Sequence, residues 1–325
     1  MRRIIGLVVL GLGVFLLVMA PMLKWYAAPR LLVAPLDQYS TTVSEASDVT
    51  YLDIAALEVR TGREFVATRT VRGDVEAGDS DTAVWDVFVK IVDPEKPGEG
   101  EDQLVTATTD RVAFDRSTSE AENCCGENLN GEPTEHQGIE YKFPFGTQKE
   151  TYQYFDTSIA AATDMVFVQE SELEGLAVYE FEQVIEPTKI AELDVPGDLV
   201  GSDEATLTVD RYYSNTRHVW VEPTTGVIVK GAEHQVATLN DGDEELLTIT
   251  DAQLEFNEAT VTAQAETAEE NKSLADLVTT TGPIGAAVVG LVLLVVGVLL
   301  ARTRRDDDTA YQGRRAARPV DFQKA

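Results

Sequence analysis

Two long apolar stretches stand near the ends of this 325-residue chain, at residues 4–23 and 283–301. A helix needs about 20 consecutive apolar residues to cross the hydrocarbon core of a bilayer. Both stretches have that length, so the sequence predicts two membrane-spanning helices. Residues 24–282 must then form a separate folded segment on one side of a membrane.

Arginines on the outer flanks of the two stretches predict the orientation. Arg2 and Arg3 precede the first stretch, and six arginines follow the second within residues 302–325. Because Lys and Arg are retained on the cytoplasmic side, we expect residues 1–3 and 302–325 to be cytoplasmic and residues 24–282 to be extracytoplasmic. The alternative for the first stretch is a cleaved signal peptide. Its apolar region is usually about 7–15 residues, and the longer run here favours an uncleaved anchor.

Neither stretch contains a charged or amide side chain. Polar groups inside a membrane mark ion or substrate paths, so these helices are expected to be tethers and not a channel. Glycines could let the two helices touch through small faces, although glycine is frequent in membrane helices anyway. They are Gly6, Gly11, Gly13, Gly285, Gly290 and Gly297.

The segment between the stretches is strongly acidic. Residues 30–282 hold 52 of the 56 Asp and Glu but only 16 of the 26 Lys and Arg. Such a surface repels nucleic acid, so no nucleic-acid partner is expected. Because the acids are spread along the segment, adaptation to high salt is favoured over a specific site for cations or a basic partner.

Short strand-like runs dominate the acidic segment. Residues 64–72 and 82–92 are rich in β-branched and aromatic residues, and similar runs recur, the last of them at 260–264. Helix signals are limited to turns at 54–57 and 158–163, the latter capped by Asp156 or Thr157. The expected class is mainly β, as an elongated antiparallel barrel or sandwich-like domain between two transmembrane helices.

A weak internal similarity divides the acidic segment. Residues 111–119 align with residues 218–226, each as a strand, an acidic residue and a turn. Two similar β units, at 30–145 and 146–265 with a juxtamembrane segment at 266–282, are one interpretation. A common strand–turn pattern is the other.

Catalytic and metal-binding motifs are missing from the sequence. No nucleophile elbow, zinc helix or phosphate loop occurs, so the chain is not expected to be an enzyme, to use a cofactor or to bind a metal. The two cysteines, Cys124 and Cys125, are adjacent. Outside the membrane they are disulfide candidates, either with each other or with a second chain, and free thiols remain an alternative.

Two groups of residues are candidates for a binding site. Six aromatics fall within residues 141–155 and either line an apolar pocket, together with Trp220, or pack a core. The lipid-binding candidates are Tyr141, Phe143, Phe145, Tyr152, Tyr154, Phe155 and Trp220. Among few cations, Arg211, Arg217 and Lys230 either bind an anionic headgroup or form local ion pairs.

Several segments of the chain resemble an actinobacterial family described as PorA-like and as a domain of unknown function, which includes the lipoglycan-biosynthesis protein LmcA. The resemblance covers nearly the whole chain, and the segments that carry it are 32–39, 81–88, 123–126 (Asn-Cys-Cys-Gly), 141–146 (Tyr-Lys-Phe-Pro-Phe-Gly) and 212–217 (Tyr-Tyr-Ser-Asn-Thr-Arg). It implies a membrane-anchored periplasmic protein of the cell envelope.

The functional hypothesis joins the resemblance to the candidate residues. We expect a lipid-binding protein in cell-envelope lipoglycan biosynthesis, with a membrane lipid or lipoglycan intermediate as its partner. One alternative is a non-enzymatic scaffold for envelope glycosyltransferases. The other is a porin, which ranks lower because an outer-membrane pore would be a lipid-facing barrel and this chain offers the membrane two helices.

Overall fold

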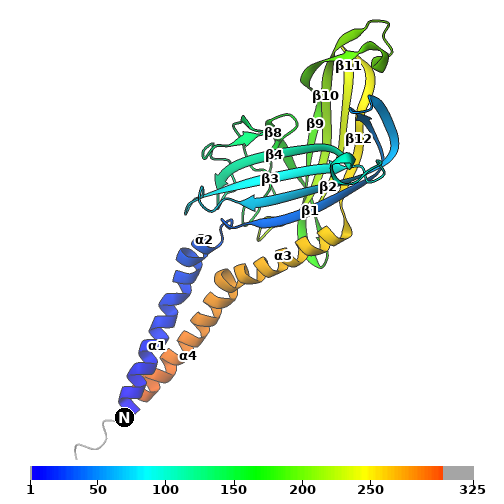
Figure 1. The fold of residues 1–325 in the computed structure, drawn as a ribbon. Coiled ribbons are helices and arrows are strands. Elements are labelled where there is room, and N and C mark those ends of the chain that lie inside the picture. The colour runs from blue at the N-terminus through cyan, green and yellow to red at the C-terminus, as the bar shows by residue number, and fades with distance from the viewer. Residues whose placement is uncertain (1, 303–325) are drawn as a thin grey trace, which may run out of the picture. The chain divides into compact units, whose positions relative to one another are not determined.

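The computed structural model describes residues 2–302, and they form two compact units (Figure 1). A helical unit joins the two ends of the chain, up to Ala28 and from Asp276 onward. A β unit comprises Pro29–Ala275. The predicted basic tail lies outside the described residues, except for Arg302.

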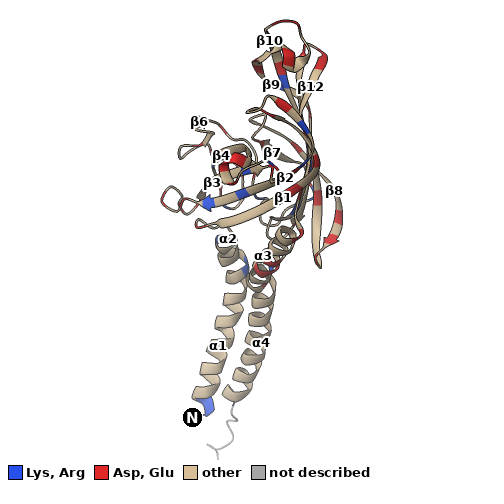
Figure 2. Ribbon diagram, turned by 45° about the vertical axis from the view of Figure 1, so that its right-hand side comes forward, with Lys and Arg blue, Asp and Glu red and all other residues tan. Residues whose placement is uncertain are grey.

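The helical unit contains both predicted spans. Helix α1 (Arg2–Met22) continues through a π-helical turn (Leu23–Ala27) into α2 (Ala28–Leu31). Helix α4 (Gly282–Ala301) follows a second π-helical turn (Leu277–Thr281). By length and composition, the helices that contain α1 and α4 could each cross a membrane. Figure 2 shows them almost free of charged residues, whereas Asp and Glu are spread over the β unit.

Glycines bring α1 and α4 into backbone contact. A β-carbon added to Gly13 would lie 2.7 Å from the backbone nitrogen of Leu294, and one added to Gly297 would lie 2.6 Å from that of Leu10. Gly6 and Gly290 face the same interface, whereas Gly11 and Gly285 have no such neighbour within 4 Å among the described residues. The helices therefore pack through small faces, as glycine-mediated membrane helix pairs do.

In the described part of the β unit, twelve strands form one antiparallel sheet, which confirms the mainly β prediction. Each strand pairs with its neighbours in sequence, except that β6 and β7 lie at opposite edges and β1 pairs with β12. The strands are β1 (Tyr39–Asp53), β2 (Glu58–Gly73), β3 (Thr82–Val92), β4 (Leu104–Asp115), β5 (Asn128–Leu129), β6 (Glu132–Pro133), β7 (Tyr152–Asp156), β8 (Ala161–Leu173), β9 (Leu176–Pro196), β10 (Thr206–Glu222), β11 (Val227–Asp241) and β12 (Glu244–Phe256).

An irregular segment links the two ends of this sheet. Ala121 bridges to β4 and donates its N–H to the carbonyl of Gly138 (2.8 Å). Next to it, Ile139 donates to the carbonyl of Gln153 in β7 (2.8 Å). Gly138 has φ +67°, and a β-carbon there would lie 2.0 Å from the Gln153 carbonyl oxygen, so only glycine fits. The sheet is thus curled like a barrel, but strand pairing does not close it.

Both segments of the internal similarity end in a turn held by an acidic side chain. Asp115 accepts hydrogen bonds from the backbone N–H groups of Ser117 and Thr118, both at 2.8 Å. Glu222 does the same for Thr224 and Thr225, at 3.2 and 2.9 Å. The local pattern of strand, acid and turn is therefore real in both halves of the sheet.

Three local predictions were wrong. Residues 260–264 belong to α3 (Glu258–Asp276), because Asn257 caps the helix through the Thr260 N–H (3.0 Å) and an alanine-rich face packs on the sheet. The expected short helix at 54–57 is a hairpin turn, and in the one expected at 158–163 residues 158–160 end a hairpin turn and residues 161–163 begin β8. Each turn begins after an aspartate that accepts a backbone N–H and includes a residue with positive φ, Leu57 or Ala160, which ends the helical path.

Candidate functional site

The concave side of the curled sheet encloses a cavity of about 710 Å³. Most of its lining side chains are aliphatic or aromatic, and ionic side chains from both halves of the sheet stand among them. The ionic residues are Arg69, Asp110, Glu140, Asp194, Arg211, Arg217 and Glu233. The β unit therefore has a hollow interior in which charged groups face enclosed space.

Arg217 is the centre of one ionic group. Its guanidinium lies 2.9 Å from both Asp156 Oδ2 and Glu233 Oε2, and it donates to Gln183 Oε1 at 2.7 Å. Burial raises the pKa of Glu233, but the charges of Arg217 and Arg69 outweigh burial and lower this pKa to about 2. Glu233 is therefore ionised at neutral pH, and the group is a fixed set of charges.

Arg211 also lines this cavity, and the polar contacts of its side chain differ from those of Arg217. Its Nε is buried and has no hydrogen-bond partner among the described residues. Burial lowers the pKa of its guanidinium. Arg211 is thus a weakly compensated cation in the cavity.

A third polar group lies where β4 meets the segment that links the sheet ends. Asp110 Oδ1 lies 2.9 Å from His136 Nε2, and Tyr141 donates its hydroxyl to Asp110 Oδ2 at 2.6 Å. Burial lowers the pKa of His136, but the hydrogen bond and charge of Asp110 and the charge of Glu127 outweigh it and raise this pKa. Burial and the charge of Asp110 raise the pKa of Glu140 well above its usual range.

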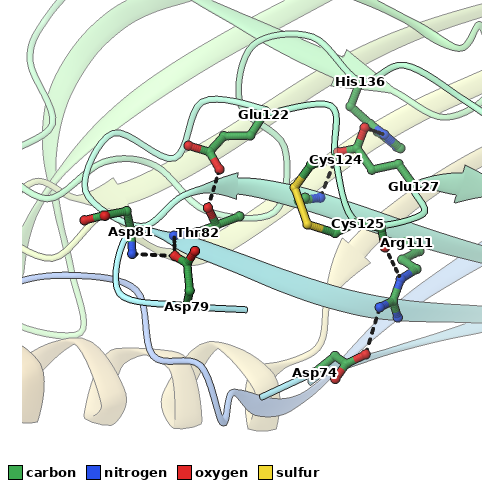
Figure 3. The surroundings of a disulfide bond; sticks show 11 residues. Asp74, Asp79, Asp81, Thr82, Arg111, Glu122, Cys124, Cys125, Glu127 and His136 are labelled. Carbon is green, nitrogen blue, oxygen red and sulfur yellow. Dashed lines mark hydrogen bonds and ion pairs between the residues drawn. A yellow bond between two sulfur atoms is a disulfide. The ribbon is translucent and has the colours of Figure 1, made fainter. Parts of the chain in front are cut away.

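The disulfide lies in the linking segment. The structure joins Cys124 to Cys125, and the Cys125 carbonyl accepts a hydrogen bond from Arg111 Nε at 3.2 Å (Figure 3). Arg111 also pairs with Asp74 and Asp86, at 2.8 and 2.7 Å. The loop is therefore held to the sheet close to Glu127 and His136.

The structure brings together only some of the residues singled out from the sequence. Five of them line the cavity, namely Tyr141, Tyr154, Phe155, Arg211 and Arg217. Phe143 and Tyr152 pack with Phe181 in the core, with ring centroids 5.3 Å (Phe143 to Tyr152) and 4.8 Å (Phe143 to Phe181) apart.

The remaining candidates lie away from the cavity wall. Phe145 lies under Lys142, whose Nζ is 4.0 Å from the ring centroid. Lys230 Nζ is 4.9 Å from the Trp220 ring centroid and pairs with Glu255. These three residues make local contacts outside the cavity wall.

Sequence reasoning missed the acidic members of the cavity wall. The wall holds four of the 56 acids, and nothing in their spacing separates them from the surface carboxylates: Asp110, Glu140, Asp194 and Glu233. The one usable signal was local: Glu140 stands four residues after His136 and beside an aromatic run.

Comparison with known proteins identifies the family. The profile of the family described as Porin PorA matches residues 5–299. The chain belongs to the Porin PorA family. The Porin PorA of Corynebacterium resistens is 26% identical over 412 aligned positions, which cover 94% of this chain and 98% of the relative. The Porin PorA of Corynebacterium amycolatum is 28% identical over 384 positions, covering 91% and 98%.

The PorA-like resemblance is thereby confirmed, but the main functional prediction was wrong. The family and both relatives are named porins, which favours the lower-ranked porin alternative over lipid binding in lipoglycan biosynthesis. The correction rests on these names. The cavity wall is mixed, with seven ionic side chains among a majority of aliphatic and aromatic ones. Phe143 and Tyr152, proposed as lipid contacts, are core residues.

Proposed function

We propose that this PorA-family chain is a porin that lets ions or small hydrophilic solutes pass across a membrane. The names of the family and of two end-to-end relatives support the proposal. The structural observation that carries it is the cavity, whose wall includes seven ionic side chains. Fixed charges facing an enclosed space suit hydrated ions, because selective pores are lined by such groups. The proposed role is not enzymatic.

Passage through the membrane requires more than one copy of the chain. The glycine contacts hold the backbones of α1 and α4 against each other, and neither apolar stretch contains a charged or amide side chain. We therefore infer that several helix pairs surround a shared passage. The acidic composition predicts a preference for cations, because a negative surface raises their local concentration.

The orientation follows from the flanking arginines. We propose that both termini are cytoplasmic and that the β unit is extracytoplasmic. Protease accessibility of an epitope tag placed after Ala325 tests this. Digestion of the tag in intact cells would contradict the orientation.

Conductance in planar bilayers is the direct test of the pore. The full-length chain, purified in detergent and added to bilayers in KCl, should produce stepwise currents, and a KCl gradient should give a reversal potential on the cation-selective side. Absence of currents at all protein and lipid compositions tried would overturn the proposal.

A matched pair of variants connects the current to the cavity. Arg211→Gln removes a cation from the cavity wall, and the reversal potential should move further towards cation selectivity. Lys230→Gln removes a cation that pairs with Glu255 outside that wall, and it should leave the reversal potential unchanged. Equal shifts in both variants would exclude the cavity from the ion path.

A further inference from the structure

Three buried side chains converge where β4 meets the linking segment. Asp110 Oδ1 lies 2.9 Å from His136 Nε2, which lies 3.9 Å from Glu140 Oε2. One ligand atom from each side chain falls within 4.8 Å of the other two. In a tetrahedral zinc site with bonds of about 2.0–2.1 Å, neighbouring ligand atoms are about 3.3 Å apart. The two separations from His136 bracket this value and the third pair lies within 4.8 Å, so shifts of at most about 1.5 Å would form such a site.

An unpartnered carboxylate oxygen points to a missing ligand. Glu140 is 7% exposed, and its Oε2 has no hydrogen-bond partner within the part of the chain that the structure describes. A buried polar atom without a partner is costly, so such atoms usually have a bound water, ion or other group beside them. Glu140 Oε2 is also the atom that faces His136.

The surroundings orient the two other ligands for metal binding. The Tyr141 hydroxyl donates a hydrogen bond to Asp110 Oδ2, so Asp110 Oδ1 is the oxygen that can bind an ion. His136 Nδ1 lies 3.5 Å from Glu127 Oε2, slightly too far for a hydrogen bond, and Glu127 Oε1 accepts the Ala113 N–H at 2.8 Å. A carboxylate behind the far nitrogen of a histidine is the usual outer contact of a metal-bound imidazole.

An ion has both space and access at this place. A pocket of about 10 Å³, the size of one small bound species, is lined by His136, Glu140 and Tyr141 among others. Asp110 does not line this pocket, but it lines the large cavity together with Glu140 and Tyr141, which gives a route from the cavity to the cluster.

We propose that Asp110, His136 and Glu140 bind one divalent transition-metal ion of the zinc class, with water as a fourth ligand. One imidazole and two carboxylates match the ligand types that such ions accept. The positive ion compensates two buried carboxylates that otherwise have one histidine between them. Because Asp110 belongs to β4 and the other ligands to the linking segment, the ion fastens this segment to the sheet edge. The site does not depend on the pore function.

Binding of Zn²⁺ to the full-length chain tests the proposal. The chain is stripped with a chelator and titrated with Zn²⁺ in detergent without reductant, so that the disulfide stays intact. Calorimetry and elemental analysis should give one Zn²⁺ per chain. X-ray absorption of the loaded wild type should show one imidazole nitrogen and oxygen ligands, without sulfur. Failure to bind, or a shell with sulfur or several imidazoles, would overturn it.

Variants assign the ion to these residues. His136→Gln and Glu140→Gln should each weaken Zn²⁺ binding at least tenfold, and Glu127→Gln should weaken it about 10–100-fold as outer contacts do. His234→Gln is the matched control, because His234 also lies beside a carboxylate (2.8 Å from Asp251) but is exposed. Equal losses in the control, or unchanged affinity in folded Glu140→Gln, would exclude the site.

Discussion

The ion pair between Arg217 and Glu233 makes a quantitative prediction about stability. The pKa of Glu233 is lowered from 4.5 to about 2, and one unit corresponds to about 1.4 kcal/mol of preference for the ionised form. The ionised carboxylate therefore stabilises the folded chain by about 3 kcal/mol at neutral pH. We expect Glu233→Gln, which keeps the shape and removes the charge, to lower the free energy of unfolding by this amount at pH 7.

The pH dependence provides an independent check on the cause. Because the folded-state pKa is depressed, the stabilisation is fully present above pH 4.5 and is lost as the pH falls towards about 2. The difference between the wild type and Glu233→Gln should shrink over this interval. Denaturant unfolding of the full-length chain in detergent, followed by far-ultraviolet circular dichroism between pH 2 and 7, measures it.

Glu255 on β12 supplies the control for this experiment. It pairs with Lys230 but is 55% exposed, and exposed pairs contribute at most about 1 kcal/mol. Glu255→Gln should therefore be nearly neutral at every pH. Equal destabilisation by both variants, or a Glu233→Gln deficit that persists unchanged at pH 2, would refute the reasoning.

Three further predictions concern packing and buried charge. Phe143 is fully buried, so we expect Phe143→Ala to lower the free energy of unfolding by about 3–5 kcal/mol. Phe145 is half-buried, so Phe145→Ala should lower it much less. Denaturant unfolding compares the two variants, and equal costs would contradict the assignment of Phe143 to the core. Asp93→Asn should cost about 3–5 kcal/mol, because buried Asp93 accepts from Arg63 at 2.9 and 3.0 Å and from the Tyr51 hydroxyl at 2.8 Å. Glu95→Gln, at an exposed carboxylate 3.4 Å from Arg63, should cost under about 1 kcal/mol. We expect Gly13→Leu to lower the free energy of unfolding in detergent by about 1–3 kcal/mol, because the larger side chain overpacks against α4. Gly11→Leu should leave the free energy of unfolding unchanged.

The sequence predicted the elements whose pattern is local. The two spans are continuous apolar runs, and strands such as β3 show β-branched and aromatic residues that fit no helix. The exceptions have physical causes. β1 is rich in Ser, Thr, Asp and Glu, so its strand character comes from pairing with β2 and β12. Residues 260–264 resemble a strand, but the cap at Asn257 and the alanines that follow favour a helix.

The candidate site was less predictable because its members are far apart in sequence. Asp110 and His136 are 26 residues apart, and Gln183 and Arg217 are 34 apart. Pairing of β9 with β10 places Gln183 opposite Arg217, and the linking segment brings His136 to Asp110 on β4. The aromatic run at 141–155 attracted attention by its density, yet the structure divides it between the core and the cavity wall.

The pairing of β1 with β12 has a consequence for how the chain acquires its fold. Among the described residues, ten of the eleven strand pairings join neighbours in sequence and can form as soon as each hairpin is available, whereas Glu45 and Asn257 at the remaining pairing are 212 residues apart. Closing so long a loop carries a large entropic cost, and non-local strand pairing is slow. The two half-sheets can therefore form early, but the edges at β1 and β12 stay unpaired until nearly the whole β unit has been synthesised. Exposed strand edges pair with other chains, so we expect misassembly between copies of the chain to begin at the β1 and β12 edges.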